Sequence, residues 1–313
     1  MTWKKPGEAA TPAERKAEAA IAAVESWRGA AISYAYVPGG LNNVNWRIRV
    51  AGAPHDYFMK VPGEGTERFI DRVVAHDAAV KAHAAGISPQ VHHYLPAERV
   101  EVATFLDEVR TANNGDFMQP PVRLAAVRTL RAFNGVAPLA HTKTIFDMID
   151  EHLEQVREVG GPAPADMAWL LHQYRTARAA LEASGLDLVP CMNDTVAANF
   201  LLGGDGKVWL IDYDYASNND RGYELALWFG EMFFTPDQEL ELIEEYFGRG
   251  DRRTVARIAV FKALADVKWS TWSMIQHRIS EIDFDFYKYG IWKHMRARIA
   301  MHDPRWAEYL RAL

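Results

Sequence analysis

The spacing of the hydrophobic residues changes once along this chain, and this change constrains the fold more than any other feature. Between residues 31 and 63 the sequence alternates in aromatic and β-branched runs: "AISYAYV", "NVNWRIRV" and "DYFMKVPG". Such runs are typical of antiparallel strands with one buried face, and turns are expected at Gly39-Gly40 and at residues 52 to 54. Two shorter strands, "VHHYLP" and "VEVATFL", follow, and the second is expected to end near Leu106.

Beyond Leu106 the pattern is helical almost throughout. We predict helices over residues 120–133, 144–159 and 165–184, and long helices from residue 223 to the end; only the segment from residue 194 to 216 interrupts them. The first part of the chain has two predicted helices. One covers residues 11–27 and opens with a Thr11 cap, Pro12 and Glu14, and the other covers residues 66–85 and ends before a glycine.

This order of elements predicts an α+β fold with a small strand-rich lobe, residues 1–106, and a large helical lobe, residues 107–313. A chain of 313 residues is long for a single hydrophobic core and suits two lobes. We expect a cleft at their junction, because ligands bind preferentially between domains.

Composition excludes several classes of partner. The net charge of −6 provides no basic surface for nucleic acid or for stable association with an anionic membrane. We find no run of about 18 apolar residues and no signal-peptide pattern. The single cysteine, Cys191, excludes an internal disulfide and fits a reducing cytoplasm. We expect a cytoplasmic protein that is a monomer or a simple dimer.

The strongest chemical motif lies in "CMNDTVAANFLLGGDGKVWLIDYDYA", residues 191 to 216. Asp194 and Asn199 have the D-x-x-x-x-N spacing of a kinase catalytic loop, in which Asp accepts the substrate proton and Asn binds a metal ion. The run "FLLGGDGKVWLI" predicts a β-hairpin that brings Asn199 and Asp212 to adjacent strand ends. Oxygen ligands so arranged suit one divalent cation. Either acid taken alone is better explained as a solvated side chain.

Two upstream features fit the same chemistry. The stretch "GGLNNVNW" lies between two predicted strands, where Gly39, Gly40 and small polar residues let backbone amides approach phosphates. Lys60 ends the next strand, the position from which a kinase lysine reaches the phosphates. Taken alone, a Gly-Gly pair is more often a plain hairpin turn and a lysine at a strand end is usually solvated.

The whole chain resembles the choline/ethanolamine kinases, a branch of the aminoglycoside-phosphotransferase-like, protein-kinase-like fold. The resemblance rests on "GGLNNVNWRI", "GEGTERFIDR", "MNDTVAANFLL", "LIDYDYASNNDRGYELA" and "DVKWSTWSMIQHRIS". It implies transfer of the γ-phosphate of ATP to an alcohol hydroxyl, with Asp194 as base, Mg²⁺ on Asn199 and Asp212, and Lys60 on the phosphates.

The resemblance also implies the nucleotide contacts. The segment from Val102 to Leu106 would be the hinge that offers backbone hydrogen bonds to adenine. The expected nucleotide-binding residues are Gly39, Gly40, Asn42, Asn43, Asn45, Lys60, Thr104 and Leu106.

The acceptor is expected to be a small cationic alcohol such as choline. Trp269 and Trp272 lie three residues apart and share one face of a helix, and aromatic faces bind quaternary ammonium groups. In the family a similar tryptophan pair is joined by a tyrosine after the metal-binding Asp and by an acidic residue; the matching residues here are Tyr215 and Glu231, with Tyr287 as a further wall. The alternatives are a tryptophan pair packed in the core and an exposed Glu231.

Two positions depart from the family pattern. Met192 replaces the His that usually stands two residues before the catalytic Asp; because that His mainly supports the loop, we expect slower turnover but no loss of a reacting group. Ala75 replaces the Glu expected after "IDR", so Lys60 lacks its usual helical partner. Asp71 and Asp77 are the nearby substitutes, but residues two apart on a helix lie on different faces.

Three hypotheses stay open at this point: a kinase of choline or a related amino alcohol, a kinase of another cationic alcohol such as thiamine or an aminoglycoside, and a catalytically weak or inactive kinase-fold protein that binds a nucleotide or a cationic metabolite. Paired tryptophans weaken the aminoglycoside option, since such sites favour many carboxylates. The joint presence of Asp194, Asn199 and Asp212 weakens the third.

Overall fold

The computed structural model describes residues 1–40, 43–63 and 65–313. The chain divides into two compact units. The first contains Met1–Thr111 and Phe200–Tyr215, and the second contains Ala112–Asn199 and Ala216–Leu313. The predicted division after residue 106 differs from this in two respects: the first unit extends to Thr111, and the hairpin segment that begins at Phe200 belongs to it.

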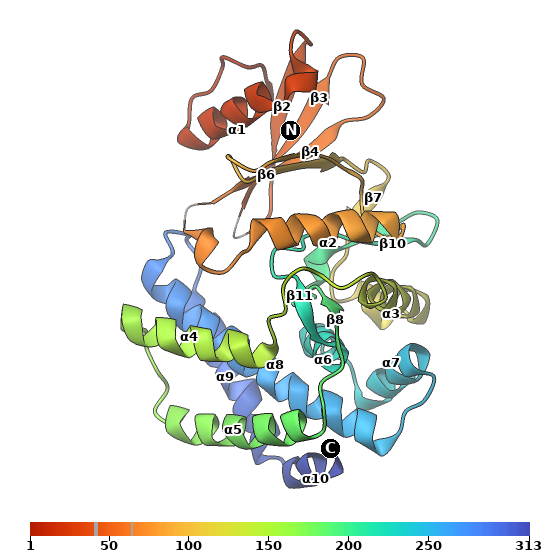
Figure 1. Ribbon diagram of the computed structural model, residues 1–313, viewed down its shortest axis with the longest axis vertical. Coiled ribbons are helices and arrows are strands. Elements are labelled where there is room, and N and C mark those ends of the chain that lie inside the picture. Colours follow the sequence, from red (N-terminus) through yellow and green to blue (C-terminus); the bar gives the residue numbers. More distant parts are fainter. Residues whose placement is uncertain (41–42, 64) are drawn as a thin grey trace. The chain divides into compact units, whose positions relative to one another are not determined.

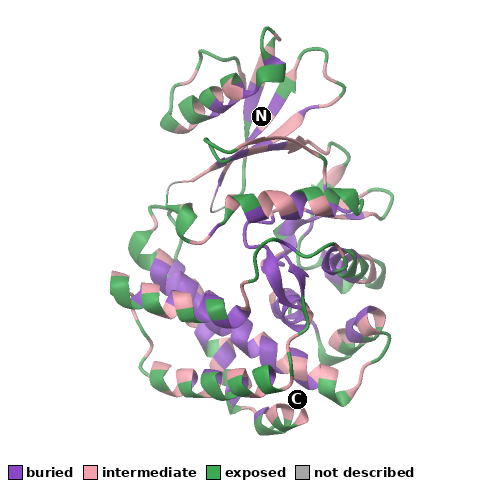
Figure 2. Cartoon of the chain, viewed as in Figure 1, coloured by how far each residue is buried: buried purple, intermediate pink, exposed green. Residues whose placement is uncertain are grey.

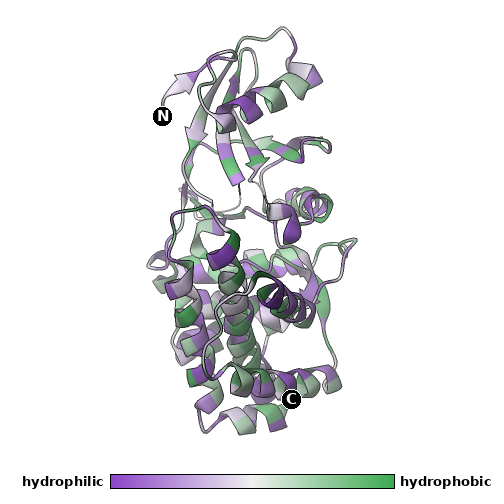
Figure 3. Cartoon of the chain, turned by 90° about the vertical axis from the view of Figure 1, so that its left-hand side faces the viewer, coloured by the Kyte–Doolittle hydropathy of each residue, from purple (hydrophilic) through white to green (hydrophobic). Residues whose placement is uncertain are grey.

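The first unit is built on an antiparallel six-stranded sheet with the strand order β1-β2-β3-β4-β6-β5. Its strands are β1 (Trp3–Lys4), β2 (Ile32–Val37), β3 (Asn43–Val50), β4 (Tyr57–Pro62), β5 (Val91–Leu95) and β6 (Val100–Thr104). Hydrophilic and hydrophobic residues alternate along β3, "NVNWRIRV", and the strands of the first unit contain residues of both kinds (Figure 3). One face therefore contributes a hydrophobic core that includes Tyr34, Ile48 and Met59.

Two helices accompany this sheet (Figure 1). Helix α1 (Pro12–Ala23) begins with the predicted capping box of Thr11 and Glu14, contacts β4, and is followed by a 3₁₀ turn, Glu25–Trp27. Helix α2 (Arg72–Ala84) is shorter than predicted, because Thr66–Arg68 forms a separate 3₁₀ turn and Asp71 caps the helix. Its N-terminus is therefore fixed by the Asp71 side chain, which accepts hydrogen bonds from the amides of Val73 and Val74.

A second, three-stranded sheet completes the first unit, with the order β10-β9-β7. The strands β9 (Phe200–Gly203) and β10 (Val208–Leu210) form the predicted hairpin, and Phe200 is the register partner of Leu210. Strand β7 (Val109–Thr111) pairs with β9. The amide of Leu210 donates a hydrogen bond to the carbonyl of Ile87 at 2.8 Å, which connects the hairpin to the segment after α2.

The second unit is mainly helical. Its helices are α3 (Pro120–Asn134), α4 (Ile145–Val159), α5 (Met167–Ala183), α6 (Arg221–Met232), α7 (Pro236–Phe247), α8 (Arg252–Ile279), α9 (Phe286–His302) and α10 (Trp306–Ala312). Short 3₁₀ turns cover Asp116–Met118 and Ala197–Asn199. Two strands, β8 (Leu188–Cys191) and β11 (Ser217–Asp220), form an antiparallel pair within this unit.

Helix α8 is the core of the second unit. It contacts α4, α5, α6, α7, α9 and α10, and most of its residues are buried, whereas the outer helices expose one face (Figure 2). A helix that is surrounded on all sides is expected to be apolar all round. Two buried residues of α8, Asp266 and Lys268, carry a formal charge and depart from this expectation.

Most predicted elements are confirmed, and the strands outside the first sheet are the main omissions. The helices predicted over residues 120–133, 144–159 and 165–184 correspond to α3, α4 and α5. The prediction that only the segment around the hairpin interrupts the helical region was wrong, because β7, β8 and β11 also lie there. Among the described residues, no helix is long and apolar enough to cross a membrane.

Candidate active site

The predicted catalytic loop begins where strand β8 ends. Cys191 is the register partner of Ser217 in the β8–β11 pair, and Met192, Asn193 and Asp194 follow directly. Met192 is fully buried, while Asp194 is only partly buried. Asn193 has a left-handed backbone with φ of 59°, which an Asn tolerates better than most residues. The turn at Asn193 thus directs the chain out of the buried strand pair immediately before Asp194.

A buried glutamate in α6 holds this turn. Glu224 accepts a hydrogen bond from the amide of Met192 at 2.7 Å and another from the amide of Asn193 at 3.0 Å. Burial raises the pKa of Glu224 to about 7, although the two hydrogen bonds act in the opposite direction. Because both carboxylate oxygens bind backbone groups of the loop, the position of Asp194 depends on Glu224.

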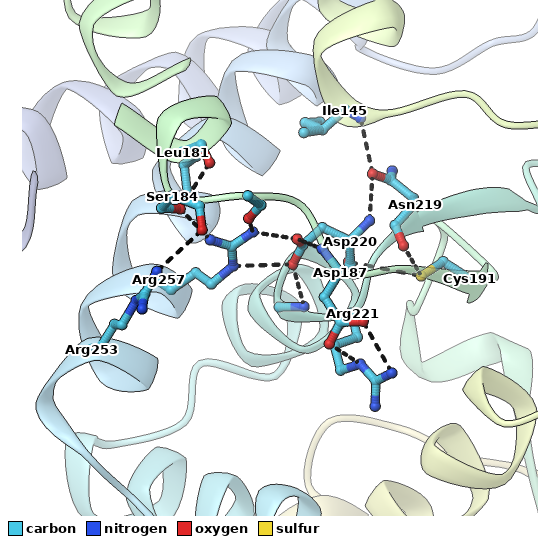
Figure 4. A network of polar contacts seen from close by, with 12 residues as sticks. Ile145, Leu181, Ser184, Asp187, Cys191, Asn219, Asp220, Arg221, Arg253 and Arg257 are labelled. Carbon is cyan, nitrogen blue, oxygen red and sulfur yellow. Dashed lines mark hydrogen bonds and ion pairs between the residues drawn. The ribbon is translucent and has the colours of Figure 1, made fainter. Parts of the chain in front are cut away.

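Hydrogen bonds of side-chain amides and an ion pair with an arginine stabilise the β8–β11 pair. Asn219 donates to the Oδ1 of Asn193 at 2.9 Å, and its own Oδ1 accepts from the amide of Ile145 at 3.1 Å. Next to Asn219, Arg257 of α8 forms an ion pair with Asp220 and donates a hydrogen bond to Ser184 (Figure 4). The loop therefore rests on a scaffold of polar contacts that are mostly buried.

The predicted metal ligand Asn199 is oriented by the loop itself. Its Nδ2 donates to the backbone carbonyl of Asp194 at 2.8 Å, so its Oδ1 is the atom available for a cation. Magnesium prefers oxygen ligands, and the amide oxygen of Asn199 meets this requirement. The D-x-x-x-x-N spacing thus corresponds to a real contact between its two ends.

The first unit carries Lys60 and the acids that follow β10. The Nζ of Lys60 lies 2.7 Å from the Oδ1 of Asp212 and 2.6 Å from the Oδ1 of Asp214. Asp212 has a left-handed backbone with φ of 66°, a strained conformation that often marks functional residues. Burial and the charge of Asp214 raise the pKa of Asp212. Burial alone would raise the pKa of Asp214 too, but the charges of Lys60 and Arg72 outweigh the effect of burial, so the pKa of Asp214 is lowered.

Asp214 is the centre of this cluster. It also accepts hydrogen bonds from Arg72 of α2 at 2.9 Å and from Asn43 of β3 at 2.8 Å. Burial alone would lower the pKa of Lys60, but Asp212 and Asp214 raise it above its ordinary value, so Lys60 is cationic. The carboxylate of Asp212 has oxygen atoms of the kind that magnesium prefers, and its role as a metal ligand stays a prediction.

The missing helical glutamate does not leave Lys60 without a partner. Of the two substitutes considered, Asp71 caps α2 and Asp77 pairs with Lys81 at 2.7 Å, so neither serves Lys60. The partners come from the segment after β10. Helix α2 is linked to the sheet by His76, whose Nδ1 lies 3.0 Å from the Oε2 of Glu101.

The glycine-rich turn is only partly described, because Asn42 lies outside the described residues. Gly39 and Gly40 both have positive φ, 121° and 83°, as a turn with close backbone approach requires. The Nδ2 of Asn45 donates to the carbonyl of Gly39 at 3.2 Å and closes the turn. At the expected hinge, Thr104 ends β6, and its backbone N–H donates a hydrogen bond to the carbonyl of Gln90 at 2.8 Å. Leu106 is partly buried. Their contact with adenine stays a prediction.

The tryptophan pair lies at the buried centre of α8. Trp269 and Trp272 are each 5% exposed, and their rings meet edge to face with centroids 5.4 Å apart. The pair is therefore buried next to charged groups, and its contact with a cationic acceptor stays a prediction. The Nζ of Lys268 lies 3.1 Å from the centroid of the Trp269 ring.

The two tyrosines expected to contact the acceptor, Tyr287 and Tyr215, lie in different surroundings. Tyr287 is half-exposed, its ring faces His277, and it lines a small pocket with Met274 and Gly290. The tyrosine beside Trp272 is Tyr289, at 6.2 Å between ring centroids. Tyr289 therefore lies beside the tryptophan pair, while the predicted contact of Tyr287 with a substrate stays a prediction. Tyr215 is buried and lies two residues before β11.

Glu231 is neither exposed nor free of partners. Its carboxylate forms an ion pair with the buried Lys293 of α9, and its backbone carbonyl accepts from Asn114 at 2.6 Å. Lys293 also lies 5.3 Å from the centroid of the Tyr289 ring. Nearby, Arg296 pairs with Asp266 at 3.0 Å; burial nevertheless raises the pKa of Asp266 to about 6.

Sequence reasoning missed several of these residues: Glu224, Asp214, Arg72, Lys268, Lys293 and Tyr289. A charged residue inside an otherwise apolar helical run was the available indication for Glu224, in "YELALWF", and for Lys268, in "DVKWSTW". Asp214 alternates with Asp212 after β10. It was overlooked because one acid already fulfilled the expected role.

Comparison with known proteins decides the family. The family model for choline/ethanolamine kinase matches residues 35–244, which is more than half of the chain. The chain belongs to the choline/ethanolamine kinase family. Members of this family are phosphotransferases that act on an alcohol group, and this chain is a phosphotransferase of that class.

Individual relatives agree with the family assignment. A probable choline kinase 2 of Arabidopsis thaliana is 24% identical over 277 residues, which cover 79% of this chain and 78% of that protein. Ethanolamine kinase 1 of Mus musculus is 25% identical over 279 residues, 74% of each chain. The crystal structure of a choline/ethanolamine kinase family protein from Mesorhizobium loti superposes with a TM-score of 0.82 at 28% identity, covering 96% of this chain and 98% of that one. The fold is thus protein-kinase-like, as predicted.

Proposed function

We propose that this protein transfers the γ-phosphate of ATP to the hydroxyl of choline or a related amino alcohol, with Asp194 as the general base. The observation that carries the proposal is that one side chain, Lys268, lies on the face of Trp269 and also interacts electrostatically with Asp194. The proposed base and the proposed aromatic wall therefore both lie in the part of the second unit that surrounds Lys268.

Asp194 is suited to its role by its surroundings. It is partly buried, it stands on a loop held by Glu224, and its backbone carbonyl is bonded to Asn199. A carboxylate so fixed can accept the proton of the acceptor hydroxyl as the oxygen attacks phosphorus. The leaving ADP takes up the electron pair of the broken P–O bond, and the proton stays on Asp194 until it is released to solvent.

The nucleotide would be held mainly by the first unit. An ammonium group has three donors, and two of those of Lys60 reach Asp212 and Asp214, which leaves one for a phosphate oxygen. The amides of the Gly39-Gly40 turn would bind further phosphate oxygens. Asn199 and Asp212 would hold Mg²⁺, which, when bound, neutralises negative charge on the phosphates.

A panel of acceptors tests this function. Purified protein is mixed with Mg-ATP and with choline, ethanolamine, thiamine or an aminoglycoside, and the release of ADP is measured. We expect an amino alcohol to raise ADP release well above the background with ATP alone. Release only with thiamine or the aminoglycoside would contradict the proposed acceptor, and bound ATP with no stimulation by any acceptor would support a catalytically inactive kinase-fold protein.

A further inference from the structure

Helix α8 places an ammonium group of the protein on the aromatic surface that a cationic substrate would use. Lys268 is 1% exposed, and its Nζ lies 3.1 Å from the centroid of the Trp269 ring. Burial lowers the pKa of Lys268 to about 7, so its amino group is cationic below that pH, where the contact with the ring is a cation–π contact at close range. The rings of Trp269 and Trp272 meet at 79° with centroids 5.4 Å apart, so the ring face under Lys268 is part of the aromatic surface of the pair.

The acidic side of the same region is also neutralised from within the chain. Glu231, the residue expected to attract the substrate cation, forms an ion pair with Lys293, and Lys293 approaches the ring of Tyr289. Lysines of the protein thus occupy positions next to both aromatic walls. A second cation that enters this region meets like charge.

Quaternary and primary ammonium groups respond differently to such a site. A quaternary ammonium has no N–H, so ring faces are its main binding surface. A primary ammonium has three donors and binds carboxylate oxygens, each of which accepts more than one hydrogen bond. The carboxylates of Glu231 and Asp266 therefore suit a primary ammonium even when lysine and arginine side chains already contact them.

We propose that Lys268 is a specificity-determining residue, whose ammonium covers the face of Trp269 and makes the acceptor site favour an amino alcohol with a primary ammonium group over one with a quaternary group. The inference rests on the proposed function. It concerns the choice between acceptors, and not the transfer step, for which Asp194 is the proposed base.

The test compares Lys268→Met with the wild-type protein. Methionine keeps the length of the side chain and removes its charge. The matched control is Lys207→Met, because Lys207 also stacks on a tryptophan, with its Nζ 3.4 Å from the centroid of the Trp209 ring, in the β9–β10 hairpin. For each protein, kcat/KM is measured with ethanolamine and with choline. The ratio of the two values cancels any effect of Lys268 on Asp194 that both acceptors share.

We expect wild-type protein to prefer ethanolamine, and Lys268→Met to shift the ratio toward choline by about tenfold, mainly through the KM for choline. Lys207→Met should keep the wild-type ratio. An unchanged ratio in Lys268→Met, or a wild-type preference for choline, would overturn the proposal.

Binding measured by calorimetry keeps the two proposals separate. Choline and ethanolamine are titrated into wild-type protein and Lys268→Met without ATP. If neither acceptor is phosphorylated, the proposed function fails, while tighter choline binding by Lys268→Met still supports the role of Lys268. If the methionine variant does not fold, wild-type binding decides: ethanolamine should bind more tightly, and choline binding equally or more tightly would contradict the inference.

Discussion

The Nζ of Lys60 lies 2.6 Å from the Oδ1 of Asp214, which stands two residues after Asp212, the predicted metal ligand. The same ammonium reaches Asp212, and Asp214 in turn holds Arg72 of α2 and Asn43 of β3. The cluster joins the sheet, α2 and the segment after β10. It explains why the first unit tolerates Ala75 where relatives of this chain are expected to have a glutamate.

Replacing Lys60 by methionine should leave the buried carboxylate of Asp214 and the partly buried carboxylate of Asp212 without their shared cation. We expect a large increase in the KM for ATP and a loss of about 3–5 kcal/mol in the free energy of unfolding, as found when one partner of a buried ion pair is removed. Urea denaturation and ATP kinetics measure the two effects. Lys81→Met removes the partly exposed pair with Asp77 in α2 and should cost less than about 1 kcal/mol. Equal losses in the two variants would contradict the account of Lys60.

The substitution Ala75→Glu tests whether Lys60 needs a helical partner. Because Asp212 and Asp214 already bind its ammonium, a new glutamate in α2 should bring no gain in the affinity for ATP. The measurement is the Kd of ATP for the variant and the wild-type protein. A gain of about tenfold or more would show that the present cluster leaves Lys60 incompletely fixed.

Glu224 should make stability depend on pH in a defined direction. Its pKa is raised from 4.5 to about 7 by burial, so between these values the folded chain holds the proton more firmly than the unfolded chain does. The stabilisation is complete below pH 4.5 and is lost as the pH rises to 7, by about 3 kcal/mol for this carboxyl. Asp266 titrates over part of the same range, so the difference between wild-type protein and Glu224→Gln isolates the contribution of Glu224.

Glu224→Gln should also affect catalysis, since the glutamine side chain has one acceptor for the two amides of Met192 and Asn193. We expect kcat to fall by about 10²-fold through displacement of Asp194. The surface variant Glu245→Gln, which loses a pair with Arg128, is the control and should keep both stability profile and kcat. Wild-type kcat in Glu224→Gln would mean that the loop is fixed by other contacts.

Met192 is predicted to act through packing alone. Its side chain is fully buried and its amide bonds to Glu224, which any residue with an N–H would preserve. Met192→Leu conserves volume and should change the free energy of unfolding by less than about 1.5 kcal/mol with similar kcat. Met192→Ala should cost about 2–5 kcal/mol. If the leucine variant folds normally but loses activity, the thioether has a role that packing does not explain.

The sequence predicted local features well. The capping box of α1, the β9–β10 hairpin and the Asp194–Asn199 contact are encoded by neighbouring residues, so periodicity and spacing were sufficient. The contacts of Lys60 were not predictable in this way. Lys60 and Asp214 are 154 positions apart, and nothing in the local pattern distinguishes Asp214 from a solvated acid.

The acceptor region shows the same limit. The spacing of Trp269 and Trp272 predicted a shared face, and the structure agrees. The position of Lys268 over the Trp269 ring depends on how α8 is buried among α4, α6 and α9, which the sequence pattern does not specify. Tyr287 and Tyr289 are both near the start of α9, and only the packing of that helix shows that Tyr289 is the one beside Trp272.

Phosphorus NMR of the reaction mixture tests whether Asp194 is the base of an amino-alcohol kinase. Wild-type protein, Asp194→Asn and the exposed hairpin variant Asp205→Asn are each incubated with Mg-ATP and ethanolamine or choline. We expect a phosphomonoester of the amino alcohol together with ADP for the wild type and for Asp205→Asn. For Asp194→Asn we expect a rate lower by about 10²–10⁴-fold with ATP binding preserved. A phosphomonoester formed by Asp194→Asn at the wild-type rate, or no phosphomonoester from the wild-type protein, would contradict it.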